Sequence, residues 1–136
     1  MQSSFDIDTK LRVCTIRIRG LVTAPRLAQA FFQAFASPDW DRSFNLMIVY
    51  EAEALLGELT LDELRELQTK LNDRQAKVGI RHRIKSALVY GRPEQRTLLD
   101  LHVLSYNDQD FLEERVFGTE ADAMLWLTRP AHAASD

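Results

Sequence analysis

Apolar positions along the chain follow two spacings, and these predict strands and helices in turn. The segment SSFDIDTKLRVCTIRIRG predicts two strands around a turn at residues 8–10, the second strand covering about 11–19 and ending at Gly20. In the second strand Cys14, Ile16 and Ile18 share one face. Three later strands are predicted at residues 44–50, about 84–90 and about 112–117. The 44–50 run is almost continuously apolar, which is typical of a strand buried on both faces.

Helical spacing fills the intervals between these strands. The predicted helices are one that follows Thr23 and stops at Ser37-Pro38, one over about 61–78, one from Pro93 to about Tyr106, and a last one, EADAMLWL, after Thr119. Thr60 and Glu63 form a T-x-x-E capping box at the start of the second helix. In the last helix we expect Met124, Leu125 and Leu127 to cover the core.

The resulting order is ββαβαβαβα. It predicts a single α/β domain over residues 1–127, with a mixed, mostly parallel five-stranded sheet and about four helices. Residues 128–136 at the end of the chain are mostly small or polar, and we expect them to form a flexible C-terminal tail.

Composition narrows the class of protein without naming a reaction. The 136 residues are 46% hydrophobic and 27% charged, with a formal net charge of −3, which indicates a globular protein and neither nucleic acid nor an anionic membrane as partner. Cys14 is the single cysteine, so no internal disulfide can form. No apolar run reaches the length of a membrane span, and the first residues lack the features of a signal peptide. We therefore expect a cytoplasmic protein.

Several segments together carry a likeness to a known family. They are the opening hairpin, the helix after RGLVTAPRLAQAF, the strand NLMIVY, the helix TLDELRELQTKL and the ending ERVFGTEADAMLWL. Over about residues 5–127 the chain resembles a STAS-type domain, the anti-sigma-factor antagonist fold, and is most similar to its bacterial SpoIIAA-like relatives.

The resemblance implies regulation or binding rather than catalysis. Antagonist members bind a partner kinase and are switched by phosphorylation of a Ser or Thr where the helix after the central strand begins, and other relatives bind small ligands or regulate transport. The family's D-S-S-G-L segment is matched here by GELTLDEL, in which Thr60 is the only hydroxyl. The resemblance therefore points to Thr60 as the possible phosphoacceptor, whereas the sequence around it describes a helix cap.

Ligands of open α/β sheets bind outside the carboxyl ends of the parallel strands. At that edge we expect the loop EAEALLGE, residues 51–58, with Glu51 and Glu53, and the turn with Tyr90 and Arg92. With Thr60 these are the candidate residues for binding a ligand or partner. The two glutamates could divide acid and base roles, or could simply be the solvated end of a strand. Arg92 could clamp an anion at a helix start, or the turn could serve only the fold.

Other chemistry-bearing residues are scattered. His102 is expected as a half-buried packing residue of the third helix, and Cys14 as a small core residue. No metal-ligand spacing, phosphate loop or nucleophile arrangement is legible, so we expect no metal and no cofactor. Charge is locally polarised, with six acids and one base in residues 51–66 but seven bases and one acid in 74–96. That pattern is explained by solvated helix faces or by docking to a partner.

Three functions stay open. The first is a non-enzymatic regulatory or binding module that acts through a protein partner or a small ligand at the carboxyl edge of the sheet. The second is a small enzyme that uses Glu51 and Glu53. The third is a self-assembling interaction protein, for example a homodimer. Its exposed apolar stripe would come from the leucine-rich second helix or from residues of the third helix such as Leu98, Leu101 and Val103.

Overall fold

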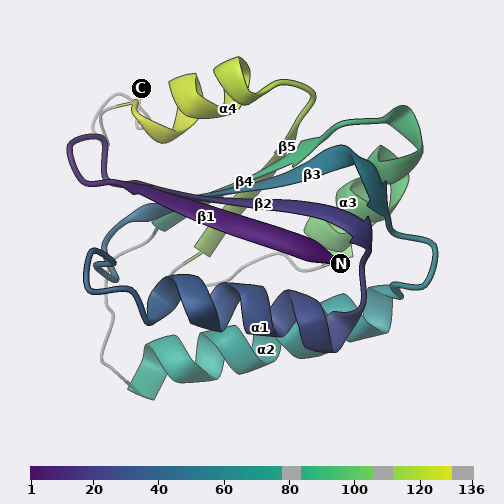
Figure 1. Cartoon of the computed structure of the whole chain (residues 1–136), viewed down its shortest axis with the longest axis horizontal. Coiled ribbons are helices and arrows are strands. Elements are labelled where there is room, and N and C mark those ends of the chain that lie inside the picture. The colour runs from purple at the N-terminus through teal and green to yellow at the C-terminus, as the bar shows by residue number, and fades with distance from the viewer. Residues whose placement is uncertain (78–83, 106–111, 130–136) are drawn as a thin grey trace.

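The computed structural model of the chain describes residues 1–77, 84–105 and 112–129 (Figure 1). Its strands are β1 (Gln2–Asp8), β2 (Val13–Leu21), β3 (Asn45–Leu55), β4 (Ile84–Tyr90) and β5 (Leu112–Phe117). Its helices are α1 (Ala24–Phe35), α2 (Leu61–Lys77), α3 (Pro93–Ser105) and α4 (Glu120–Leu127). The predicted order of elements is confirmed over these residues.

The strands form one sheet in the order β1-β2-β3-β4-β5. β1 is antiparallel to β2, and every later pair is parallel, so the predicted mixed and mostly parallel sheet is confirmed. Figure 1 shows α1 and α2 on one side of the sheet and α4 on the other. α3 joins α1 and α2, because all three helices contribute buried residues to the same core cluster.

The two faces of the sheet therefore have separate cores. Cys14, Ile16 and Ile18 point into the larger core under α1, α2 and α3, as their alternation predicted. Val13 points into the smaller core under α4. Burial, with a smaller contribution from Asp6, raises the pKa of the Cys14 thiol to about 12, so this cysteine is an unreactive core residue.

The opening hairpin has the predicted turn. The Asp8 carboxylate accepts hydrogen bonds from the backbone N–H groups of Lys10, at 3.0 Å, and Leu11, at 2.9 Å. Arg12 has a φ of 60°, and β2 begins after it at Val13 rather than at residue 11.

β2 and β3 are both longer at their carboxyl ends than predicted. β2 continues through Gly20, whose φ is 81°, and after a register shift Gly20 and Leu21 pair with Ala54 and Leu55. The prediction of a loop over residues 51–58 is therefore wrong for 51–55, since β3 runs to Leu55, and is confirmed for 56–58. Backbone hydrogen bonds hold this extension, and they do not require apolar side chains.

Helix starts follow the predicted capping chemistry in most places. Thr60 and Glu63 form the expected reciprocal box, with Glu63 N–H donating to Thr60 Oγ1 at 3.1 Å and Thr60 N–H donating to Glu63 Oε1 at 3.0 Å. Thr119 Oγ1 accepts from Asp122 N–H at 3.2 Å. Thr23 precedes α1 as expected, but its side chain makes no capping hydrogen bond.

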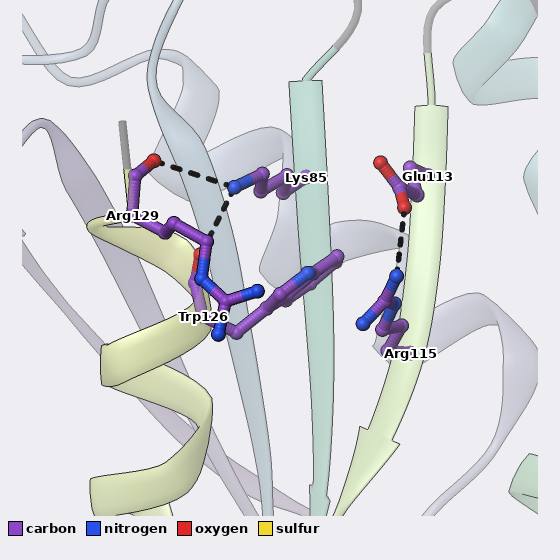
Figure 2. A network of polar contacts seen from close by, with 5 residues as sticks. All are labelled: Lys85, Glu113, Arg115, Trp126 and Arg129. Atoms are coloured by element: carbon purple, nitrogen blue, oxygen red, sulfur yellow. Dashed lines mark hydrogen bonds and ion pairs between the residues drawn. The ribbon is translucent and has the colours of Figure 1, made fainter. Parts of the chain in front are cut away.

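The prediction for α4 holds for Leu127, which is buried, and for Met124, which packs against the smaller core, but it is wrong for Leu125. Leu125 is 70% exposed and does not cover the core, whereas Trp126 and Leu127 are buried. The indole lies between two cations: Lys85 Nζ is 5.4 Å and Arg115 Cζ is 5.1 Å from the ring centroid. Figure 2 shows the Trp126 ring extending from α4 across β4 toward Arg115. These contacts decide which side of this short helix faces the sheet.

The predicted tail from residue 128 begins with two residues in contact with the fold. Thr128 Oγ1 donates to the Met124 carbonyl at 2.8 Å, and Lys85 Nζ donates to the carbonyls of Trp126 at 3.0 Å and Arg129 at 3.5 Å (Figure 2). The rest of the tail, 130–136, lies outside the described residues, as do the predicted ends of α2 and α3 at Val78 and Tyr106. Within the described ranges, no helix combines the length and apolarity needed to cross a membrane.

Candidate functional site

Glu51 and Glu53 lie on the face of β3 away from the larger core. Glu51 is partly buried and lines a small polar groove with Arg17, Arg19 and the start of β1, while Glu53 is exposed. Arg17 makes a two-pronged ion pair with Glu120, with N–O distances of 2.8 and 2.7 Å. This pairing raises the pKa of Arg17 and lowers that of Glu120. Glu120, which does not line the groove, therefore neutralises one of its two arginines.

Arg92 lines a different groove, at the carboxyl edge of the sheet. This carboxyl-edge groove is formed by Leu21, Ala54, Leu55, Leu56, Gly57, Glu58, Arg92, Glu94, Gln95 and Leu98. Tyr90 lies on the α3 side of β4, where its hydroxyl is 3.5 Å from Arg96 Nη1 and Arg96 Cζ is 5.7 Å from its ring centroid. Thr60 is exposed in its capping box, and its role as a phosphoacceptor stays a prediction. The five predicted site residues are thus spread over several places.

Gln95, which sequence reasoning missed, organises the carboxyl edge. Its buried side-chain carbonyl accepts from Gly91 N–H at 2.8 Å and Arg92 N–H at 3.2 Å. Its amide nitrogen donates to the backbone carbonyls of Glu51 and Ala54, both at 2.9 Å. One side chain therefore joins the start of α3 to the extension of β3. A polar residue in the first turn of a helix is common, so the sequence alone could not single out Gln95.

Gly91 is required where this turn passes β3. A Cβ at this position would lie 2.5 Å from Ala52 N, 2.8 Å from Glu51 C and 2.9 Å from Tyr50 O. All three are backbone atoms of a paired strand, which cannot move aside easily.

Gly91→Ala is expected to lower the free energy of unfolding by about 1–3 kcal/mol, because the added methyl group overpacks the junction. Urea unfolding followed by circular dichroism would measure the loss. Gly57→Ala is the matched control, since a Cβ there meets nothing within 4 Å, and it should change stability by less than about 0.5 kcal/mol. Equal effects of the two substitutions would contradict the close approach.

A mostly apolar pocket lies between the sheet and the three helices of the larger core. Its floor comes from β3, β4 and β5, and its roof from α1, α2 and α3. The lining residues of this interior pocket are Leu27, Phe31, Phe35, Leu46, Ile48, Tyr50, Leu64, Leu67, Gln68, Leu71, Ile84, Ser86, Leu88, Leu99, His102, Leu112 and Glu114. About 50 Å³ inside it is open to the centres of water-sized spheres.

Five polar side chains line this otherwise apolar pocket. They are Tyr50, Gln68, Ser86, His102 and Glu114. His102 Nε2 is 3.2 Å from Glu114 Oε1, and the two side chains are only 6% and 10% exposed. Ser86 and Glu114 are register partners on β4 and β5. Burial, together with the charge of Glu114, raises the pKa of Tyr50, so its hydroxyl stays neutral.

The burial of His102 and its contact with Glu114 were not predicted from the sequence. The expectation of a half-buried packing residue is corrected, because His102 is buried and paired with a carboxylate from another element. One local signal was present: Glu114 alternates with Leu112 and Val116 on the inner face of β5, and Gln68 follows Leu64 by one helical turn. Acidic and amide side chains at inward positions mark a polar site within a core.

Among chemical tasks, the lining of the interior pocket is suited to recognising a small molecule. Concave, mainly apolar pockets with a few convergent polar groups are the usual form of small-molecule sites. Within the residues that the structure describes, no group of three or more His, Cys, Asp or Glu side chains could hold a metal ion.

One apolar surface considered from the sequence lies on α3. On α3, Leu101 and Leu104 are exposed, whereas Leu98 and Val103 are partly buried against the core. The expected exposed apolar residues of the third helix are therefore present in part.

Comparisons of the chain with protein-family models, with curated proteins and with solved structures gave no significant match.

Proposed function

We propose that this chain is a non-enzymatic binding module that holds a small ligand in the interior pocket. The observation that carries the proposal is that five polar side chains line a partly open, mostly apolar pocket of the larger core. The ligand position differs from the sequence-based hypothesis, because the pocket lies between the sheet and its helices and not at the carboxyl edge.

The energetics of the polar cluster support binding. Burying a carboxyl group, an imidazole and several other polar groups costs free energy that well-packed apolar residues of similar size would not cost. Tyr50, Ser86 and Glu114 lie on three adjacent strands, in positions where leucine or valine would pack the core directly. A ligand that uses these groups gives a physical reason for their presence.

The resemblance to STAS-type domains supports the same class of function. That family includes ligand-binding and regulatory members, and the ββαβαβαβα order of this chain is compatible with it. A regulatory role, a protein partner and a bacterial source stay proposals that rest on this resemblance. Self-assembly stays a proposal that rests on the apolar helix residues, and a cytoplasmic location one that rests on the single cysteine.

Small aromatic probes are expected to stabilise the protein. Toluene or benzyl alcohol at saturating concentration should raise the melting temperature by about 5 °C or more, because a ligand that binds only the folded state adds its binding free energy to stability. Leu71→Trp, which fills the pocket from α2, should remove this rise. Leu125→Trp, on the exposed side of α4, is the matched control and should keep it.

Two results would overturn the proposal. One is the absence of a shift in the wild-type protein with every probe. The other is a shift that persists in a folded Leu71→Trp variant. If that variant does not fold, methyl NMR of the wild type decides, since probe-induced changes must centre on Ile48, Leu88 and Leu99.

A further inference from the structure

We infer that the ligand carries a hydroxyl or amine donor on a compact apolar body, and that Glu114 accepts this donor inside the interior pocket. The inference rests on the proposed function and adds the chemical class of the ligand. It stands on the position of Glu114 in the floor of the pocket and on its contact with His102.

Glu114 has acceptor capacity beyond its contact with His102. Its Oε1 atom lies 3.2 Å from His102 Nε2. An ionised carboxylate has two oxygens with about four lone-pair sites in all, and it accepts hydrogen bonds without donating any. A second donor can therefore join the pair, and hydrogen bonds to a charged acceptor are stronger than neutral ones. The hydroxyl of a bound alcohol, or a bound ammonium group, supplies such a donor.

The same geometry disfavours an anionic ligand. A ligand carboxylate beside Glu114 would place two like charges in a poorly solvated space, where their repulsion is much larger than in water. The lining residues that the structure describes include no lysine or arginine, and His102 is already engaged by Glu114. Burial raises the pKa of the neighbouring Tyr50 hydroxyl, and the charge of Glu114 adds to this rise.

The volume of the pocket also limits the size of the ligand's apolar body. About 50 Å³ is open to sphere centres, which is about a third of the roughly 150 Å³ cavity, lined by leucine, isoleucine and phenylalanine, that takes up benzene. The pocket is also partly open to solvent. A short alkyl chain therefore fits inside against residues such as Phe31, Ile48 and Leu99, and a single ring fits with part of it at the opening.

Four probes of similar shape test the inference: benzyl alcohol, benzylamine, toluene and benzoate, each titrated by NMR at pH 7. In the wild-type protein, benzyl alcohol and benzylamine are expected to bind at least about tenfold more tightly than toluene and benzoate. In Glu114→Gln, which keeps the shape but removes the charge, benzylamine should lose about tenfold in affinity and benzoate should gain. Glu113→Gln is the matched control, because Glu113 is the adjacent residue on β5 and pairs with Arg115 on the other face (Figure 2).

The outcomes separate the inference from the proposed function. If no probe binds, toluene included, the pocket is not a ligand site and both fall. If probes bind but toluene or benzoate is the tightest, or Glu114→Gln and Glu113→Gln behave alike, the ligand class is wrong while the binding function stands. If Glu114→Gln does not fold, the wild-type ratio of benzylamine to benzoate affinity decides, and a ratio of one or less overturns the inference.

Discussion

Gln95→Ala is expected to lower the free energy of unfolding by about 3–5 kcal/mol. The Gln95 side chain satisfies two backbone N–H groups, of Gly91 and Arg92, and two backbone carbonyls, of Glu51 and Ala54. Each buried polar group that loses its partner costs about 1–3 kcal/mol, and water entering the space left by the side chain recovers part of the total. Urea unfolding followed by circular dichroism would measure the change.

Two further variants make this test specific. Gln95→Glu keeps acceptors for Gly91 and Arg92 but turns a carboxylate oxygen toward two carbonyls, so it should also destabilise. Glu94→Gln, at the exposed neighbouring position, should stay within about 0.5 kcal/mol of the wild type. A loss below about 1 kcal/mol for Gln95→Ala would show that this side chain does not hold the junction.

Trp126→Ala is expected to cost about 3–5 kcal/mol, the usual range for removing a buried aromatic side chain. Trp126 is buried in the smaller core, with its ring centroid 5.5 Å from that of Phe117. The substitution also removes the ring that lies between Lys85 and Arg115 (Figure 2). Because α4 has only eight residues and this core is small, few other contacts can compensate.

Circular dichroism is the suitable measurement here, since the substitution removes a fluorophore. Leu125→Ala, one residue away on the exposed side of α4, should change stability by less than about 0.5 kcal/mol. Trp126→Phe should fall between the wild type and alanine, because it keeps a ring in the core. If the alanine and phenylalanine variants matched the wild type, α4 would contribute little to the fold.

The order of elements could be predicted because it depends on residues that are neighbours in the chain. The strands at 84–90 and 112–117 have the predicted bounds, and the Thr60–Glu63 box begins α2 where expected. Alternation, helical spacing and capping each involve positions at most a few residues apart, so the local sequence contains them in full.

The end of β3 could not be predicted in this way. The apolar run stops at Tyr50, and the carboxylates after it indicate a loop. The strand nevertheless continues, because β2 passes beyond Gly20 and offers Ala54 and Leu55 a pairing partner. Side-chain hydrophobicity says little about whether a backbone partner is present.

The chain's local patterns thus determined an α/β domain with a five-stranded sheet, and determined where most of its helices begin. The interior pocket was decided only by tertiary structure. Gln68, Ser86, His102 and Glu114 come from four different elements, and each alone is an ordinary polar residue of a helix or strand. They form a site because the parallel register places Ser86 beside Glu114 and the packing of α3 brings His102 onto that carboxylate. Such contacts depend on the summed geometry of the whole sheet and its helices, which short-range sequence patterns do not encode.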